Sequence, residues 1–194
     1  MRKSKAETAK TRQRIVEVAA EAIRTKGIDA TGVAEVMAAA GLTHGGFYRH
    51  FDSKEALVAE ALQMSRADYL AATVQAAEQG PHALLEHFRN YVSPANRDDV
   101  GGSCALAANG SEIVRSDAIT RRQATESLKL WFDKAAPHMR GMDEESKSEL
   151  AISLITNMIG ALTMARMVDD PALSEQILKA ARDRIDETFA VAES

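Results

Sequence analysis

The sequence has few of the features that mark exported or membrane proteins. Its single cysteine among 194 residues excludes an intramolecular disulfide framework and is compatible with a reducing cytosol. The first fifteen residues carry charge in place of an apolar core, so no secretory signal is expected there. The longest uncharged stretch, Leu150 to Ala165, has 16 residues and includes polar side chains. It is too short and too polar for a membrane span. We therefore expect a cytoplasmic protein that does not bind a membrane.

Catalytic motifs are also missing. The sequence has no HExxH, GxSxG or GxGxxG motif and no phosphate-binding loop. The adjacent carboxylates Asp98 and Asp99 fall at an expected helix start, where capping explains them. His82 and His87 are five residues apart and point to different faces of a helix, which disfavours a metal pair. The sequence predicts neither an enzyme nor a bound metal or other cofactor.

The sequence also lacks β-strand patterns, because Val, Ile and Thr never run together in the alternating arrangement of a strand. Ala, Leu, Glu, Lys, Gln and Met dominate, and the chain is 45% hydrophobic and 27% charged, close to globular averages. The expected helices span about residues 4–26, 31–40, 43–50, 54–79, 82–93, 102–114, 117–136, 143–168 and 172–192. Their expected side-chain caps include Ser4 with Glu7, Thr31, Thr43, and either Asp52 with Glu55 or Ser53. The fold class is all-α.

Charge is distributed unevenly along the chain. Residues 1–54 have ten Lys and Arg against six Asp and Glu, a net charge of +4. Residues 55–194 have fourteen against twenty-two, a net charge of −8. A basic N-terminal end on an acidic body can approach a polyanion while the rest of the molecule is repelled. A solvated N-terminus without a partner is the alternative on charge alone.

The segment from Thr31 to Lys54, TGVAEVMAAAGLTHGGFYRHFDSK, has a helix-turn-helix pattern, with a turn at Gly41 between two short helices. Its inward apolar positions are Val33, Val36, Met37, Leu42, Phe47 and Phe51. Its outward positions are Thr43, His44, Gly45, Tyr48, Arg49 and His50. The second helix therefore presents hydrogen-bonding side chains near its N-terminal end, which suits the major groove of DNA.

Two adjacent glycines, Gly45 and Gly46, stand in that second helix. Each destabilises a helix by about 1 kcal/mol relative to alanine. Without side chains, however, the backbone can come very close to another surface. This combination indicates a contact face.

The segment GLTHGGFYRHFDSKEAL, after the helix TGVAEVMAAA and a basic first helix, resembles the DNA-binding domain of the TetR family of bacterial transcriptional regulators. The resemblance covers about residues 10–62, and Tyr48, His50, Phe51 and Lys54 are its most specific part. It implies an N-terminal three-helix bundle with the helix-turn-helix (residues 1–52). A larger helical ligand-binding and dimerisation domain (residues 53–194) would follow.

The resemblance also implies roles for individual residues in binding a double-stranded DNA operator. Three residues, Thr43, His44 and Gly45, would meet base edges or the adjacent backbone. Four would contact phosphates: Thr31, Tyr48, His50 and Lys54. Arg49 would contact either a base or a phosphate. The basic arm of Arg2, Lys3 and Lys5 would reach the minor groove or the flanking backbone.

The helix of residues 150–168 is apolar nearly all round, and an intrachain core accounts comfortably for only one apolar face. We therefore expect a homodimer built from this helix and the last one, as in TetR-family dimers, with complete burial inside one subunit as the alternative. The expected interface residues are Leu154, Met158, Ala161, Ala165, Ile177, Ala181 and Ile185. A twofold dimer would present two recognition helices to a near-palindromic operator.

The middle of the chain supplies aromatic and sulfur-containing residues that suit a pocket for an apolar or aromatic small-molecule effector. They are Phe88, Tyr91, Cys104, Leu128, Trp131, Phe132 and Met158. An ordinary core is the alternative for each of them. Cys104 lies near the start of a helix, where a thiol is either a sensor of oxidants or a buried, inert side chain.

These patterns together predict a DNA-binding transcriptional regulator. Repression with release by a small ligand is the commoner behaviour of the family it resembles. The alternative is a helical protein-interaction module whose basic end binds a partner protein without specific DNA binding.

Overall fold

The computed structural model describes residues 5–189, and within that range the regular structure is helical, with one isolated β-bridge between Met139 and Phe189. The N-terminal elements are α1 (Lys5–Lys26), α2 (Val33–Ala39), the 3₁₀ helix η1 (His44–Arg49) and the long α3 (Lys54–Gln79). The remaining elements are α4 (Pro81–Tyr91), α5 (Pro94–Asp98), α6 (Ala105–Val114), α7 (Ala118–Ala135), the 3₁₀ helix η2 (Ala136–His138), α8 (Glu144–Met167) and α9 (Pro171–Thr188).

The N-terminal bundle packs α1, α2, η1 and the first half of α3 around one core. Its buried apolar side chains come from α1 (Ile15, Val16, Ala19, Ala20, Ile23), from the helix-turn-helix (Val36, Met37, Ala40, Phe47, Phe51) and from α3 (Leu57, Val58, Ala61, Leu62). Val33 and Leu42 are partly buried against them. The predicted inward face of the helix-turn-helix is therefore confirmed. The expected helix ends near residues 26 and 40 are confirmed too, because Gly27 and Gly41, which follow them, have positive φ, 89° and 72°.

Of two predicted caps, Thr31 is wrong and Thr43 is confirmed in position only. The N-cap residue of α2 is Gly32, and the hydroxyl of Thr31 instead donates to the carbonyl of Gly27 at 2.7 Å. Thr43 does stand at the N-cap of the next helix, but its side chain makes no capping hydrogen bond. That helix is also a 3₁₀ helix, in which Gly46 N–H donates to the carbonyl three residues back, and not an α-helix. The two glycines disfavour the α-helix at this point. The expected cap Ser4 lies outside the described residues.

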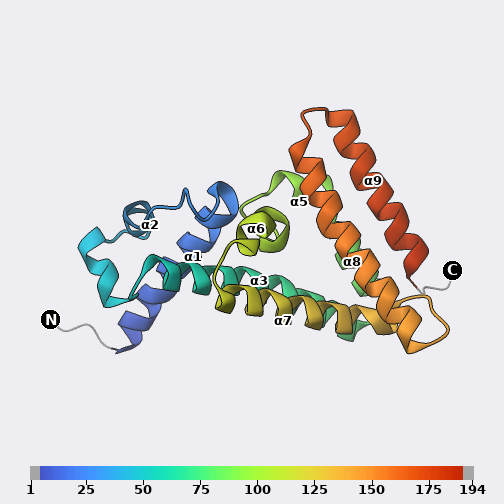
Figure 1. Cartoon of the computed structure of the whole chain (residues 1–194), viewed down its shortest axis with the longest axis horizontal. Helices are drawn as coiled ribbons and strands as arrows, with labels where there is room; N and C mark the ends of the chain where they lie inside the picture. Colours follow the sequence, from blue (N-terminus) through green and yellow to red (C-terminus); the bar gives the residue numbers. More distant parts are fainter. Residues whose placement is uncertain (1–4, 190–194) are drawn as a thin grey trace.

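The long helix α3 belongs to both halves of the molecule. Ser53 caps it, accepting a hydrogen bond from Ala56 N–H at 3.2 Å, so of the two predicted starts the structure selects Ser53. Its first half packs on α1, and its second half runs beside α4 and α7 (Figure 1). The predicted bounds, 54–79, are confirmed. A domain boundary at residue 52 therefore falls just before a helix that both cores share.

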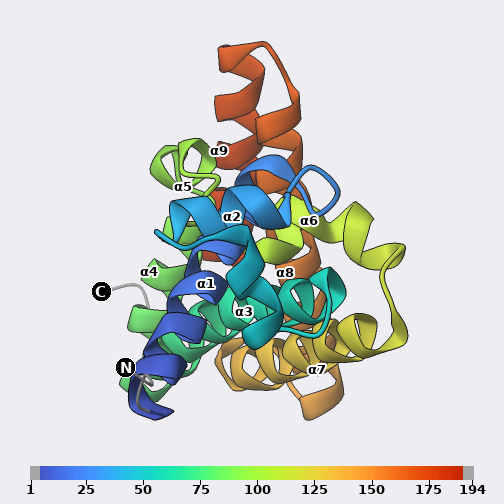
Figure 2. The same ribbon diagram turned by 90° about the vertical axis from the view of Figure 1, so that its left-hand side faces the viewer.

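The C-terminal half is a helical body in which α8 and α9 form an antiparallel pair at the end of the molecule far from α2 (Figure 1). In the view of Figure 2 the N-terminal bundle lies in front, and the upper part of the α8–α9 pair projects above it. The short helix α5 was not predicted. It forms because Ser93 accepts a capping hydrogen bond from Asn96 N–H at 3.2 Å and Pro94 occupies the first turn.

A second element joins the two halves. Ala105 and Ile113 of α6, together with Ala124 of α7, are buried in the N-terminal core. The helix α6 is kinked at Asn109, whose φ of −125° is not helical. The N-terminal bundle is thus held to the rest of the molecule through α6 as well as through α3.

Candidate nucleic-acid interface and regulatory core

The surface of η1 carries most of the predicted DNA-contacting residues. Thr43, His44, Gly45, Tyr48 and Arg49 are all exposed, and the Tyr48 side chain is 71% exposed. A tyrosine this exposed on a well-packed bundle leaves its hydroxyl and ring edge available to another molecule. The structure therefore leaves all five residues open to another molecule, in the segment just before the N-terminal end of α3.

The inner side of η1 holds that face in place. Phe47 is buried, and its ring meets Tyr48 edge-on at 5.3 Å between centroids and stacks on Phe51 at 5.6 Å. The guanidinium of Arg12 lies 4.3 Å from the centre of the Phe51 ring. Arg12 also donates to the carbonyl of His50 at 3.2 Å and pairs with Glu60 through both carboxylate oxygens. One side chain of α1 thus connects the end of η1 to α3.

Gly45 is open to solvent, with no atom within 4 Å of the position a β-carbon would take. The neighbouring turn of the bundle therefore does not require a glycine there. The close approach predicted for this backbone has to involve a molecule outside the chain, since nothing inside the chain occupies that space.

Three other predicted contact residues have partners within the bundle. Lys54 Nζ donates to the carbonyl of Asp29 at 3.3 Å, which places the ammonium group beside the turn before α2. The His50 side chain is half-buried. Thr31 is only 3% exposed and its hydroxyl points to Gly27, so this side chain stabilises the turn and does not present itself to a phosphate. Arg2 and Lys3 lie outside the described residues.

The C-terminal half of the chain, α4 to α9, is called the regulatory half below. It contacts the N-terminal bundle through hydrogen bonds from α6. Both carboxylate oxygens of Glu112 accept from Ile28 N–H, each at 3.0 Å. The Asn109 amide donates to the carbonyl of Ile23 at 2.9 Å and to Glu112 at 3.0 Å. Arg24 of α1 reaches back to Gly101 and Ser65. The contacts of Glu112 with Ile28, of Asn109 with Ile23, and of Arg24 were not predicted, because they join residues more than forty positions apart.

The predicted effector-binding residues do come together, in the core of the regulatory half. Phe88, Tyr91, Cys104, Trp131 and Met158 are buried there, and Leu128 and Phe132 are partly buried against them. Phe88 meets Trp131 at 6.2 Å and Tyr91 meets it at 5.6 Å. Sequence reasoning missed two members of this region, Arg66 and Tyr69 of α3. Arg66, Tyr69 and Thr73 are spaced three and four positions apart and therefore share one helix face. This spacing was the available sign that they belong to the same region.

The predicted dimer residues require a correction. Leu154, Met158, Ala161, Ala165, Ala181 and Ile185 are buried in the subunit's own core, and Ile177 is half-buried against it. They line the side of the α8–α9 pair that packs on the rest of the chain. Their side chains are therefore not available to a second subunit in this arrangement.

The opposite side of α8 is uncharged and uncovered. We define the outer face of α8 as Ile152, Ser153, Thr156, Asn157, Gly160, Met164 and Met167; all are exposed except the half-buried Gly160. Met167 is 76% and Met164 59% exposed. By length and composition α8 is apolar enough to cross a membrane, yet only 39% of its most apolar 18 residues are buried in the subunit. Because its inner face packs in the core, the exposed remainder indicates a further protein contact.

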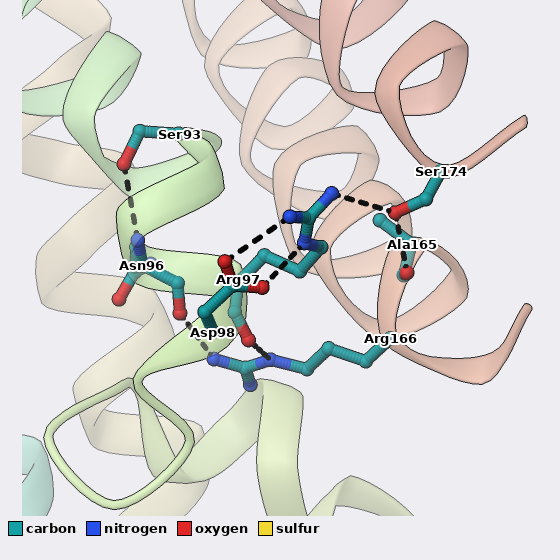
Figure 3. A network of polar contacts seen from close by, with 7 residues as sticks. All are labelled: Ser93, Asn96, Arg97, Asp98, Ala165, Arg166 and Ser174. Atoms are coloured by element: carbon teal, nitrogen blue, oxygen red, sulfur yellow. Dashed lines mark hydrogen bonds and ion pairs between the residues drawn. The ribbon is translucent and has the colours of Figure 1, made fainter. Parts of the chain in front are cut away.

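A polar network fixes the upper end of the α8–α9 pair against α5 (Figure 3). Arg166 donates to the carbonyls of Asn96 and Arg97 at 2.7 and 3.0 Å. Arg97 in turn donates to Ser174 Oγ at 3.1 Å, and Ser174 donates to the carbonyl of Ala165 at 2.7 Å. The turn between the two helices is thereby held at one angle, which sets the orientation of the outer face of α8.

Among residues 5–189, no group of three or more His, Cys, Asp and Glu side chains is placed to hold a metal ion. Cys104 is buried at the start of α6.

A three-helix unit with an exposed recognition segment, joined to a larger helical body, defines a helix-turn-helix DNA-binding protein. The family model described as bacterial regulatory proteins, tetR family, matches residues 15–61, from α1 into α3. The HTH-type transcriptional repressor BepR of Brucella suis biovar 1 (strain 1330) is 31% identical over 178 residues, covering 82% of each chain. The protein belongs to the TetR family and is a DNA-binding transcriptional regulator.

Two further relatives show where the similarity lies. The HTH-type transcriptional regulator AcrR of Shigella flexneri is 37% identical, but over 67 residues only, 34% of this chain and 31% of AcrR. The solved structure of a TetR-family transcriptional regulator from Cytophaga hutchinsonii is 23% identical and superposes with a TM-score of 0.74 over 98% of this chain and 100% of its own. The fold is shared over nearly the whole chain, whereas the sequence similarity to AcrR covers about a third of it.

Proposed function

We propose that this protein is a homodimeric repressor that binds a near-palindromic operator through η1 and is released from it by a small organic effector. The observation that supports it best is the exposed face of His44, Gly45, Tyr48 and Arg49 on a rigidly packed bundle. Repression is supported by the similarity to BepR over most of both chains.

In this proposal Tyr48 and Lys54 bind phosphates, which position the protein on the duplex without reading sequence. Thr43, His44 and Gly45 meet base edges or the adjacent backbone, and Arg49 contacts a base or a phosphate. His50 contacts a phosphate from its half-buried position. For Thr31 the buried hydroxyl supports a structural role in the turn in place of the phosphate contact. If each subunit neutralises about four phosphates, the logarithm of a dimer's affinity falls with log salt at a slope of about −7.

The outer face of α8, with the exposed side of α9, forms the subunit interface in the proposed dimer. Leu173 on α9 is 42% exposed and extends the apolar surface from Met167. Four helices, two from each subunit, would cover this surface and place the two η1 segments on the same side of the dimer. The buried residues of α8 and α9 named above then pack beneath this interface, in the core of each subunit.

The effector binds, in this proposal, in the aromatic core around Trp131. Cys104 belongs to this core and begins α6, while Asn109 and Glu112 further along α6 bind the backbone of the N-terminal bundle. A ligand that shifts α6 therefore shifts the bundle and changes the separation of the two recognition segments. A tenfold loss of operator affinity requires a difference of about 1.4 kcal/mol between the two conformations.

The test is binding of the purified full-length protein to fragments of DNA from upstream of its own coding sequence, at two salt concentrations with competitor DNA. A selective shift that weakens with salt supports the proposal and supplies the operator for effector screening. Absence of selective binding at both salts, for a dimeric protein and with distant fragments included, would instead favour the protein-interaction module.

A further inference from the structure

Arg66 is a buried cation whose charge the rest of the described chain does not neutralise. The residue is 5% exposed. One nitrogen, Nη2, donates to Gln123 Oε1 at 2.8 Å, whereas Nη1 is buried without a hydrogen-bond partner. Within residues 5–189 it pairs with no carboxylate, unlike Arg12 or Arg89. Burial lowers the pKa of its guanidinium. A buried charge without a counter-ion destabilises a fold, so the charge of Arg66 does not stabilise this one.

Three more buried polar atoms without hydrogen-bond partners lie in the same region. They are the hydroxyls of Tyr69 and Tyr91 and the indole Nε1 of Trp131. The Tyr69 hydroxyl is near Thr73 and the Tyr91 hydroxyl is near Cys104, but neither pair has the geometry of a hydrogen bond. All four groups are donors, and none of the four is satisfied by the protein.

The side chains that carry these donors are neighbours in the structure. The Tyr69 ring lies 5.2 Å from that of Tyr91 and 5.0 Å from that of Trp131, measured between centroids. Arg66 and Tyr69 are one turn apart on α3. Tyr91, Trp131 and Cys104 are buried in the same core, and Tyr69 packs against it. Cys104 stands at the N-cap of α6, so this core adjoins the start of that helix.

We propose that the effector of this repressor is an organic acid, whose carboxylate pairs with Arg66 and whose aromatic or apolar body lies against Tyr69, Tyr91 and Trp131. A carboxylate supplies the missing negative charge and accepts several hydrogen bonds at once, and guanidinium matches its planar geometry. The three rings provide the apolar walls. This inference rests on the proposed effector-released repressor and narrows the ligand from apolar or aromatic to one that carries an anionic group.

A carboxylate here would also act on the link between the two halves of the molecule. It would lie beside Cys104, at the first turn of the helix whose Glu112 binds Ile28 N–H. The rings now pack against one another, so a ligand has to separate them and displace the start of α6. Binding at Arg66 and movement of the N-terminal bundle are thereby connected through one helix.

The test compares matched acids and amides on the full-length protein. Benzoate, phenylacetate and hexanoate are titrated beside benzamide, phenylacetamide and hexanamide by calorimetry. The fluorescence of Trp131, the only tryptophan in the sequence, reports whether binding occurs in this core. We expect at least one acid to bind about tenfold or more tightly than its amide and to change the Trp131 emission.

The variant Arg66→Met keeps the length and apolar stem of the side chain and removes the charge. We expect this variant to bind an acid and its amide about equally. The preference for the acid should persist in the control Arg122→Met, which removes an exposed arginine of α7. Without ligand, Arg66→Met should melt at the same temperature as the wild type or higher, because the uncompensated charge is gone. Arg66→Gln serves as the second variant if Arg66→Met does not fold.

Three results would overturn the inference: no acid binds, an amide binds as tightly as its acid, or the preference survives in the folded Arg66 variants. In the first case buried waters satisfy the four donors.

Operator binding by the wild-type protein is measured in parallel. Selective DNA binding without an acid preference leaves the repressor proposal standing, and an Arg66-dependent acid preference without DNA binding removes the repressor proposal alone.

Discussion

Glu112 accepts a hydrogen bond from the backbone N–H of Ile28 with both carboxylate oxygens at 3.0 Å. Glu112 belongs to α6 of the regulatory half, and Ile28 belongs to the turn that leads from α1 to α2. The contact spans 84 positions of sequence and joins the kinked helix beside the aromatic core to the DNA-binding bundle. It gives a direct route by which a change in that core reaches the recognition segment.

We expect Glu112→Ala to separate effector binding from DNA release. The variant leaves Ile28 N–H half-buried without its partner, which lowers the free energy of unfolding by about 1–3 kcal/mol. The ratio of operator affinities without and with effector should move towards one. Glu112→Gln retains an acceptor and is the matched control. If the alanine variant responds to effector as fully as the wild type does, α6 does not transmit the signal through this contact.

Tyr48→Phe should weaken operator binding by about tenfold or more, since a hydrogen bond to a charged phosphate contributes about 1.5–3 kcal/mol and 1.4 kcal/mol is tenfold. The thermal stability should not change, because the side chain is 71% exposed and the ring contact with Phe47 is kept. Titration of labelled operator and of a scrambled duplex measures the effect. An equal loss on both duplexes supports a phosphate contact, and unchanged binding excludes it.

Gly160→Arg should dissociate the dimer without unfolding the subunit. An added β-carbon at Gly160 meets no atom within 4 Å, so the subunit accommodates a side chain there. A second subunit packed on the outer face of α8 does not, because close helix packing leaves no room for arginine. Sedimentation and circular dichroism should show a helical monomer. Thr125→Arg on the exposed side of α7 is the control, and a dimeric Gly160→Arg would place the interface elsewhere.

His87 should make the protein less stable as the pH falls. Burial lowers its pKa in the folded state, where its Nε2 lies 3.0 Å from Thr73 Oγ1. The unfolded chain binds a proton near pH 6.5, whereas the folded one does so only at lower pH. Below about pH 6.5 the unfolded state therefore holds more protons, and the free energy of unfolding falls by up to about 1.4 kcal/mol per pH unit.

The measurement is urea unfolding between about pH 5 and 7 for the wild type and for His87→Gln, with His82→Gln as control because that side chain is exposed on the same helix. The wild type and the control should lose stability with the same slope, and His87→Gln should lose less. Burial lowers the pKa of His138 as well, so part of the slope should persist in all three proteins. Equal slopes in all three would show that His87 does not contribute.

Local patterns sufficed for the elements that depend on neighbours in sequence. The bounds of α3 follow from Ser53 and from Gly80 with Pro81, and the turns at Gly27 and Gly41 follow from the need for positive φ. The inward residues of the helix-turn-helix follow from helical spacing. The cap at Thr31 was wrong because its hydroxyl donates to the carbonyl of Gly27, and such local acceptors compete with capping.

The interface residues show the limit of periodicity. A helix that is apolar nearly all round, such as α8, does not itself indicate which side faces its own core. The tertiary structure packs Leu154 and Met158 inward and leaves Met164 and Met167 outward, while Arg166 binds α8 to the α5 carbonyls and Arg97 binds α5 to Ser174 of α9. The contacts of Arg166 join residues about seventy positions apart.

The sequence by itself determined the helical class, the DNA-binding segment and the family, because these depend on helix spacing, caps and a local motif. Only the tertiary structure decided that Arg66 lies buried without a carboxylate among Tyr69, Tyr91 and Trp131, and that Glu112 binds Ile28. The physical reason is that the energies of buried charges and of long-range hydrogen bonds depend on what surrounds each group in space, which no local pattern encodes.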